Sequence, residues 1–449
     1  MVFDIFRWRF HVETSFCFGT SLITAFRYTL MMESPDPSDR SLCIRPNYLH
    51  SLRASIEARV GIASGGPGCI SMVLGEPEFE RPGFINDAIA RAVYKEKAGY
   101  ELPRGMIQLR ESIARYLNSV SGIDYDPSSE IIVTAGAKEA LCLAGRICAD
   151  HQDVILTQTP TWTGYEGMDV LSEGALVPIE TSGRMLSSDD LERRIATMKS
   201  LDSAKKFKCY AFDQETGRRV RAILVNTPNN PTGEVISPLE QDRIMDFIEG
   251  KELMLIADEV YKSFIFDGVK YRPFCAVPGI KPKLLLIDSF SKTYNMTDLR
   301  VGFIAGPAKF IASACSSHGN LMTCLPRLTQ AGAIAAIESG EAGERFIQGR
   351  VKEYQYRRDF FFDGLSRIEG FNSVPQVKPQ GTFYAWIDIS AFPFKSEEYF
   401  KLLLEEGVAC APGKPFGDDN FVRYSLTVKT DRFPEILARH ASFAKKYAR

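Results

Sequence analysis

From about residue 130, the chain alternates short apolar runs with stretches of helical character. Strands that are buried on both faces of a sheet are nearly continuous in apolar residues, and the helices that alternate with them cover the two faces. The pattern predicts an α/β fold with a three-layer, mostly parallel sheet and helices on both faces. The runs are Ile131-Ile132-Val133, Val154-Ile155-Leu156, Ala222-Ile223-Leu224-Val225, Leu253-Met254-Leu255-Ile256, Leu284-Leu285-Leu286-Ile287 and Val301-Gly302-Phe303-Ile304.

Five of the six runs are followed within a few residues by side chains or backbone suited to ligand binding. Ligands in open α/β sheets bind outside the carboxyl ends of the strands, so we expect these groups to converge on one crevice. They are Gly136-Ala137-Lys138, Trp162, Asn230, Asp258 with Tyr261, and Ser289 with Lys292.

The segment Ser289-Phe290-Ser291-Lys292, followed by Arg300, places a lysine and a candidate anion site at one strand end. A lysine amine attacks carbonyl carbon when fixed cations or partial desolvation lower its pKa. Schiff-base chemistry at Lys292 is one interpretation, and a solvated loop lysine is the other. This segment alone does not decide between them.

Length and composition limit the classes of partner. With 449 residues, 45% hydrophobic and 24% charged, the chain can form one large domain plus a smaller one, or two comparable domains. Its 54 basic and 56 acidic residues give a formal net charge of -2, so we expect neither a nucleic-acid nor a membrane partner. The ten cysteines contain no CxxC pair and the five histidines no metal-ligand spacing. Free thiols in a reducing, cytoplasmic compartment and no metal site are therefore expected.

The first 31 residues are rich in aromatic side chains without a clear period. Their longest uncharged stretch, Thr14 to Phe26, is too short to span a bilayer. A secretory signal is disfavoured because Asp4 and Glu13 flank it and no small-residue cleavage site follows. An organelle-targeting segment, or sequence upstream of a start at Met31 or Met32, stays open.

The chain shows no linker long enough to separate independent modules. An extra stretch at 198–219 looks like a surface excursion that ends in a hairpin, and it carries no predicted chemistry. From roughly residue 336, amphipathic helices mix with strand-like runs, as in a smaller α+β domain. We predict an unassigned N-terminal extension at 1–31, a large domain at 86–335, and a small domain formed by 32–85 with 336–449.

Three further signals occur in a fixed order: Asn226 to Gly233 (NTPNNPTG), Ala257 to Tyr261 (ADEVY), and Ser289 to Lys292 followed by Arg300. Together they resemble the fold-type I aminotransferases that use pyridoxal 5'-phosphate (PLP), within the class I and II group. The resemblance extends from about residue 45 to the C-terminus. One motif alone occurs in unrelated loops, but the ordered set after successive predicted strands has few competing explanations.

The resemblance implies roles for the catalytic residues Lys292, Asp258 and Tyr261. Lys292 would bond covalently to the cofactor and move the substrate's proton as general base and acid. PLP withdraws electrons while its ring nitrogen is protonated, and Asp258 would face that nitrogen. Tyr261 and Asn230 would donate hydrogen bonds to the phenolic oxygen. Glu259 is left out of the site.

The resemblance also assigns the cofactor's phosphate and ring. The amides of Gly136, Ala137 and Lys138, at a helix start, would bind the phosphate, because a helix N-terminus favours anions by roughly 0.3–1 kcal/mol. Further contacts implied by the resemblance come from Ser289, from Arg300, from Trp162 stacked on the ring, and from Tyr100, which reaches the neighbouring subunit's phosphate. A homodimer with shared active sites follows from the last contact.

For the substrate, the resemblance implies that Arg423 binds the α-carboxylate with its planar guanidinium. Gly75 would contact the same carboxylate through its backbone, although a plain turn glycine is a fair alternative. Asn230 and Trp162 would also contact the substrate. Lys138 matches a position where some aspartate-using relatives bind the distal carboxylate, which slightly favours an acidic substrate.

Two departures from the family pattern stand out. Asp298-Leu299 replaces a common Gly-Trp or Gly-Leu pair, a change expected to alter a turn and not the chemistry. The segment Asn320 to Pro326 lacks the usual Ser/Thr-rich character, so family contacts there cannot be carried over.

The predicted function is amino transfer from an L-amino acid to a 2-oxo acid. The alternatives are another PLP reaction on the same fold, such as a β-elimination lyase, a cyclase or an oxidase, and more remotely a ligand-sensing regulator. A regulator needs a basic DNA-binding module, and the segment before residue 45 is too short and too weakly charged to be one.

Overall fold

A computed structural model describes residues 68–96, 99–165, 174–181, 187–196, 211–213 and 218–448. The chain divides into two compact units, Met1–Arg45 and Pro46–Arg449, and every described residue belongs to the second unit. The predictions for the N-terminal segment 1–31, and for most of the insertion at 198–219, lie outside the described residues.

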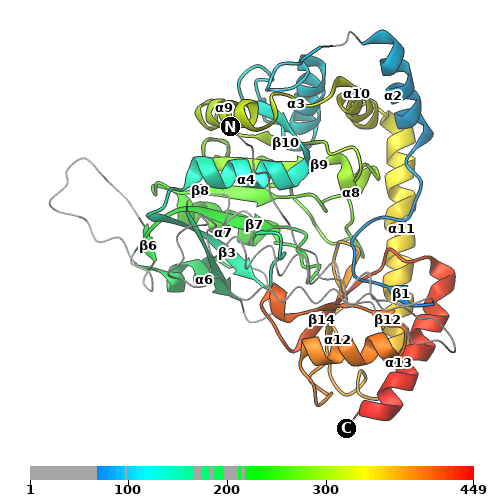
Figure 1. Cartoon of the computed structure of the whole chain (residues 1–449). Coiled ribbons are helices and arrows are strands. Elements are labelled where there is room, and N and C mark those ends of the chain that lie inside the picture. Colours follow the sequence, from blue (N-terminus) through cyan, green and yellow to red (C-terminus); the bar gives the residue numbers. More distant parts are fainter. Residues whose placement is uncertain are drawn as a thin grey trace, which may run out of the picture. The chain divides into compact units, whose positions relative to one another are not determined.

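A large, mostly parallel sheet forms the centre of the second unit (Figure 1). Its strands are β2 (Ile131–Thr134), β3 (Asp153–Thr159), β4 (Ala175–Glu180), β5 (Ile195–Ala196), β6 (Ala211–Asp213), β7 (Arg219–Asn226), β8 (Met254–Asp258), β9 (Leu284–Ser289) and β10 (Gly302–Ala305). Among the described residues, the main path runs β2-β10-β9-β8-β7-β3-β4. Neighbours on this path are parallel except where β10 pairs with β2 and β9.

Helices cover both faces of this sheet (Figure 1). The helices α4 (Gly136–Cys148) and α9 (Ala308–Met322) pack on one face. The helices α3 (Ile107–Ser121) and α7 (Pro238–Ile248) pack on the other, with α2 (Gly83–Lys95) and α10 (Arg327–Ile337) adding to that core. The α/β fold predicted from the sequence is confirmed.

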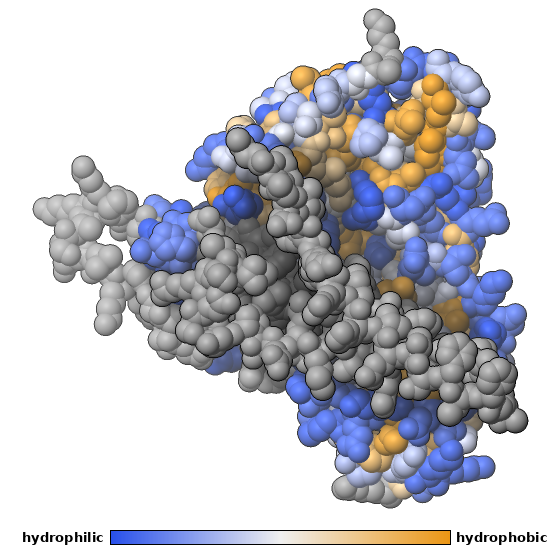
Figure 2. All heavy atoms as spheres, in the orientation of Figure 1, coloured by the Kyte–Doolittle hydropathy of each residue, from blue (hydrophilic) through white to orange (hydrophobic). Residues whose placement is uncertain are grey.

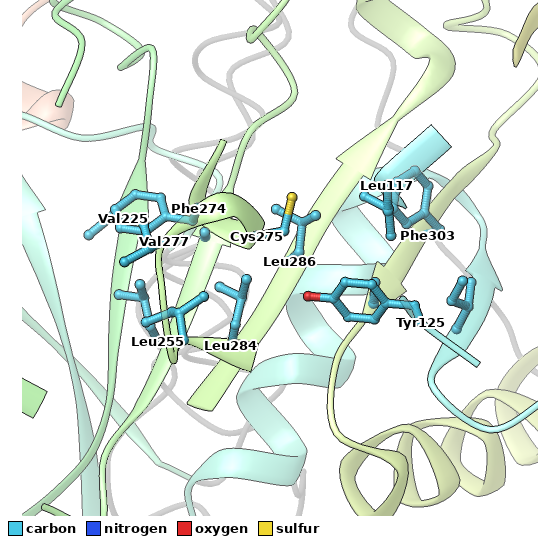
Figure 3. Close-up of a cluster of buried hydrophobic side chains, with 14 of the residues drawn as sticks. Leu117, Tyr125, Val225, Leu255, Phe274, Cys275, Val277, Leu284, Leu286 and Phe303 are labelled. Carbon is cyan, nitrogen blue, oxygen red and sulfur yellow. The ribbon is translucent and has the colours of Figure 1, made fainter. Parts of the chain in front are cut away.

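The strand β9 shows why the runs are apolar throughout. Leu285 and Ile287 belong to the core under α4 and α9, whereas Leu284 and Leu286 belong to the opposite core (Figure 3). Successive side chains of a strand point to opposite faces. Both faces are covered here, so the four consecutive positions from Leu284 to Ile287 are all apolar.

The reversed direction of β10 decides what lies at the functional edge. Gly302, its first residue, pairs with Thr134 at the end of β2 and with Ser289 at the end of β9. Arg300 therefore precedes its strand at the same edge that the other strands reach with their carboxyl ends. This is why the sixth apolar run is not itself followed by a candidate group.

The sequence analysis did not predict β4, which contains Pro178. In this structure β4 is the last strand on the main path, and Pro178 lies opposite Thr157 of β3. Proline has no backbone N–H to donate and is therefore found mostly in strands at the border of a sheet; among the described residues, β4 pairs with β3. At the insertion, β6 pairs antiparallel with the start of β7, and the turn between them lies outside the described residues.

A smaller antiparallel sheet follows in the C-terminal part, in the order β11-β14-β13. Its strands are β11 (Tyr384–Asp388), β13 (Ala411–Pro412) and β14 (Phe421–Ser425), and a separate parallel pair joins β1 (Ile70–Ser71) to β12 (Val408–Ala409). The helices α11 (Gly340–Leu365), α12 (Ser396–Glu405) and α13 (Phe433–Tyr447) share a core with β1, β11, β12, β14 and Met72. The predicted domain boundaries stay predictions.

Candidate active site

Lys292 lies one helical turn beyond the end of β9, in the short helix α8 (Phe290–Thr293). Its Nζ donates a hydrogen bond to the backbone oxygen of Gly75, at 2.5 Å. Burial lowers the pKa of Lys292, and the Arg423 and Arg300 cations lower it further, while Tyr384 and Glu76 act in the opposite direction. The pKa of this lysine is therefore shifted toward the neutral amine that a nucleophile requires.

Asp258, the last residue of β8, is a buried carboxyl group with 3% exposure. Tyr165 donates its hydroxyl to Oδ2 at 2.7 Å. Burial raises the pKa of Asp258 to about 6, although the Tyr165 hydrogen bond opposes the shift. Asp258 has no ion-pair partner among the described residues, so a cationic group brought by a ligand would stabilise its charged form.

Tyr261 and Asn230 are both buried, and Tyr261 is close enough to Asp258 to feel its charge. The Tyr261 hydroxyl is 3.2 Å from the hydroxyl of Tyr384. The Oδ1 atom of Asn230 accepts a hydrogen bond from Arg423 at 2.9 Å, which leaves the Nδ2 group of Asn230 as a donor for a ligand.

Arg423 lies on β14 with only 7% exposure. Besides Asn230, its guanidinium donates to the backbone oxygen of Val73 at 2.6 Å, and its Nε has no partner among the described residues. It forms no ion pair within the described part of the chain. A buried cation without an anion is costly, so this position favours an anionic ligand such as a carboxylate.

The start of α4 and Arg300 form the candidate phosphate site. Gly136 has φ +76°, and a Cβ placed there would lie 2.5 Å from a nitrogen of Arg300, so the close approach of the guanidinium requires glycine. Arg300 donates to the backbone oxygens of Thr297 at 3.0 Å and Ala135 at 3.3 Å. Arg300 forms no ion pair with any described residue.

The first turn of α4 leaves backbone amides available to an anion, because the carboxylate in this turn, that of Glu139, binds other groups. Glu139 accepts from the amide of Ala135 at 2.5 Å, and its other oxygen lies 2.7 Å from Nδ1 of the fully buried His318 on α9. No described residue accepts a hydrogen bond from the amides of Gly136, Ala137 or Lys138. Ser289, at the end of β9, lies at the same edge and is buried.

Trp162 lies between two of these groups. Its ring meets Tyr165 edge-on, with 5.4 Å between ring centroids, and the Nζ of Lys138 lies 5.9 Å from the centre of the Trp162 ring. Trp162 is therefore next to the Asp258 partner on one side and the start of α4 on the other.

Gly75 is not a turn glycine with left-handed backbone; its requirement is steric. A Cβ at Gly75 would lie 1.6 Å from the Tyr384 hydroxyl. By contrast, Tyr100 is 83% exposed and shares no hydrogen bond with the other candidates among the described residues. The structure thus brings together every predicted site residue except Tyr100.

Sequence reasoning missed Tyr165, Tyr384 and the Glu139–His318 pair. Tyr165 lies three residues after Trp162 and could have been considered as its neighbour. Tyr384 lies in a strand whose direction toward the site is set by the partner strand, and no local pattern indicates it. The unusual Asp298 forms an ion pair with Arg81 at 2.8 Å.

The candidate residues match PLP in their charges as well as in the hydrogen-bonding and reactive groups that they offer. Asp258 would face the ring nitrogen, Lys292 would bond to the aldehyde, Tyr261 and Asn230 would bind the phenolic oxygen, and Arg300 with the start of α4 would hold the phosphate. Asp258 is an anion without a cationic partner among the described residues, and it would meet the protonated ring nitrogen. Arg300 is a cation without an anionic partner among them, and it would meet the phosphate. Fold and site together define a PLP-dependent enzyme of fold type I.

The comparisons narrow this class to one family. The family model described as aminotransferase class I and II matches residues 69–439. A probable aspartate/prephenate aminotransferase of Aquifex aeolicus is 31% identical over 384 residues, 83% of this chain and 90% of that protein. Aromatic-amino-acid aminotransferase 2 of Thermococcus litoralis is 28% identical over 415 residues, 91% and 98% of the two chains.

Among solved structures, the aspartate aminotransferase of Thermus thermophilus with maleate has a TM-score of 0.78 at 25% identity, over 89% of this chain and 99% of that chain. The chain belongs to the class I and II aminotransferases, and it is a PLP-dependent aminotransferase. None of the helices in the described residues is long and apolar enough to cross a membrane.

Proposed function

We propose that the enzyme transfers the amino group of a dicarboxylic L-amino acid, aspartate or glutamate, to a 2-oxo acid. The observation that carries this choice is Lys138. It is an exposed cation in the first turn of α4, beside Trp162 at the site, where a second carboxylate of the substrate would meet it. Relatives that are named as aspartate or aspartate/prephenate aminotransferases support the same substrate class.

We assign the residue roles as follows. PLP, when bound, supplies a sink for the electron pair released at the substrate's Cα. Lys292 Nζ takes the Cα proton and later returns a proton, because its lowered pKa lets it act as both base and acid. Asp258 holds the charge on the ring nitrogen, and Tyr261 and Asn230 donate to the phenolic oxygen. Arg423 orients the substrate through its α-carboxylate.

We further propose a homodimer in which Tyr100 contributes to the site of the second copy. Several large apolar side chains near Tyr100 are exposed, and hydrophobic atoms are visible over α2 in Figure 2. They include Tyr94 (90% exposed), Leu102 (61%) and Leu321 (65%). Co-expression of Lys292→Ala and Tyr100→Ala chains tests this, since a mixed dimer would regain one complete site. A cytoplasmic location stays a prediction from the cysteine pattern.

The test of substrate class is a half-reaction with single amino acids. Each is added to the PLP-loaded enzyme, and loss of the visible absorbance is followed. Lys138→Met is expected to weaken the response to aspartate about tenfold, the loss of one charge-assisted contact, and to leave the response to alanine within twofold.

Lys309→Met is the matched control, because Lys309 also lies over an aromatic ring, 5.1 Å from the centre of Phe310. A response to phenylalanine but not to aspartate would refute the dicarboxylic proposal and favour an aromatic donor. Release of pyruvate with ammonia from a single substrate would indicate an elimination instead.

A further inference from the structure

We propose that Tyr384 is a positioning residue that sets two groups of the site at once, with its hydroxyl acting on Tyr261 and its ring acting on Arg423. The proposal rests on the roles assigned above to Tyr261 and Arg423. Nothing in the sequence pattern indicated Tyr384; its position follows from the pairing of two strands.

The strand register turns Tyr384 toward the site. On β11 and β14, Tyr384 lies opposite Ser425 and Trp386 lies opposite Arg423. Side chains opposite each other, and those two residues apart, share one face of a sheet. Tyr384 and Arg423 are therefore diagonal neighbours on this face, while the intervening Ala385 packs in the C-terminal core.

The hydroxyl of Tyr384 occupies a space that only glycine leaves open. It is 3.2 Å from the Tyr261 hydroxyl, and a Cβ on Gly75 would lie 1.6 Å from it. Tyr384 itself is 3% exposed. Among the described residues, Tyr261 is the hydrogen-bond partner of the Tyr384 hydroxyl.

The direction of the hydrogen bond follows from the number of protons. Each tyrosine hydroxyl has one proton to donate and can accept through its oxygen. When Tyr261 donates to the phenolic oxygen of the cofactor, it has no proton left for Tyr384, so Tyr384 must donate to Tyr261. A chain of donors polarises its members, and Tyr384 therefore makes Tyr261 a stronger donor.

The ring of Tyr384 serves the second group. The guanidinium carbon of Arg423 lies 4.3 Å from the ring centre, within the range of a cation–π contact. The hydrogen bonds to Asn230 and Val73 fix two nitrogens of the same guanidinium. The rings of Tyr384 and Phe416, the latter with its centre 4.7 Å from the same carbon, together hold the plane of the guanidinium, and this plane sets the direction from which a carboxylate is bound.

Two variants separate the two effects. Tyr384→Phe keeps the ring and removes the hydroxyl that donates to Tyr261. The ionised phenolic oxygen of bound PLP is then less stabilised, so the cofactor keeps its proton up to a higher pH. The pH midpoint of the visible-absorbance titration of the PLP-loaded enzyme should rise by about 0.3–1 unit. Tyr384→Leu also removes the ring and should weaken maleate binding about three- to tenfold, whereas Tyr384→Phe leaves it within twofold.

Other groups near these atoms must stay unchanged for the comparison to hold. Those that face Lys292 or Tyr261 are Arg423, Glu76, Arg300 and Asp258. None is altered in either variant. The matched control is Tyr399→Phe, which breaks an equal hydroxyl contact, also 3.2 Å, with Tyr424 in the C-terminal core.

The experiment measures the absorbance titration and the dissociation constant of maleate for the wild type and the three variants. An unchanged midpoint in Tyr384→Phe, or an equal shift in Tyr399→Phe, would overturn the hydroxyl part. Maleate binding by Tyr384→Leu within twofold of the wild type would overturn the ring part. A wild type that shows no visible absorbance with PLP would instead refute the proposed residue roles, so the two failures are distinguishable.

Discussion

Replacing Asp258 with asparagine should stabilise the PLP-free enzyme at neutral pH while it weakens PLP binding. Burial raises the pKa of Asp258 from 3.8 to about 6. In the unfolded chain the carboxyl group titrates near its ordinary value, so between roughly pH 4 and 6 the native state binds more protons than the unfolded state. The free energy of unfolding therefore falls as pH rises through this window.

The size of the effect follows from the shift. A difference of about 2 between the pKa values in the native and unfolded states corresponds to a loss of about 3 kcal/mol in the free energy of unfolding above pH 6. Asparagine cannot ionise, has the same shape, and still accepts the hydrogen bond of Tyr165. Urea unfolding of the PLP-free proteins should show no difference near pH 4 and a gain of up to about 3 kcal/mol for Asp258→Asn at pH 7.

PLP binding should move in the opposite direction. Removing one member of a buried charge pair typically costs about 3–5 kcal/mol, so the dissociation constant for PLP should rise by a factor on the order of 100 to several thousand. The two measurements together separate a ligand-binding carboxylate from a carboxylate that supports the fold.

Glu259→Gln is the control for this prediction. Burial also raises the pKa of Glu259, to about 7, and its Oε1 accepts from the amide of Phe274 at 2.7 Å, away from the assigned PLP contacts. This variant should also gain stability as the pH rises, but over a higher window of roughly pH 4.5 to 7, and should bind PLP as the wild type does. The reasoning fails if Asp258→Asn is less stable than the wild type at pH 7, or if it binds PLP equally well.

Three further predictions concern other parts of the site. Lys292→Ala should still bind PLP but should retain no label after borohydride reduction and proteolysis; a label elsewhere on the chain would show that another amine is the nucleophile. Arg423→Met should raise the dissociation constant for maleate at least 100-fold, since two charge-assisted hydrogen bonds are lost, and an effect below threefold would contradict its role. Glu139→Ala should weaken PLP binding severalfold and leave binding of pyridoxal, which has no phosphate, unchanged; equal losses for both ligands would indicate general damage to α4.

The sequence was sufficient to predict those features whose cause lies in neighbouring residues of the chain. Each apolar run forms a strand, because a strand that is buried on both faces has apolar residues at consecutive positions, as β9 does from Leu284 to Ile287. Lys292, Asp258 and Asn230 could be predicted as candidates because each follows such a run within a few residues. The start of α4 at Gly136 was found for the same reason.

The sequence was insufficient where the cause lies far along the chain. Tyr165 meets Asp258 across 93 residues, and Tyr384 meets Tyr261 across 123. The strand β10 runs antiparallel to its neighbours and so brings Arg300 to the functional edge, yet it consists of apolar residues just as the parallel strands do. Its direction depends on which strands it pairs with, and no local pattern records that choice.

One segment, 72–81, relates the two halves of the site and gives the departure at Asp298 a structural role. At its start, Met72 packs in the C-terminal core, and the next residue accepts the Arg423 hydrogen bond. In its middle, Gly75 accepts the hydrogen bond of Lys292.

At its far end, Arg81 pairs with Asp298 and the backbone oxygen of Phe79 accepts from Asn295 at 2.5 Å, both within six residues of Lys292. Lys292, just after the large sheet, and Arg423, in the small sheet, are thus held against two carbonyl groups of one segment, those of Gly75 and Val73. Since Asp298 is 64% exposed, its ion pair contributes at most about 1 kcal/mol to stability, and its effect is better understood as fixing the end of this segment beside the lysine. A glycine at that position would leave Arg81 without this anchor, so the change from the family pattern alters how the segment is held while the groups that perform the chemistry stay the same.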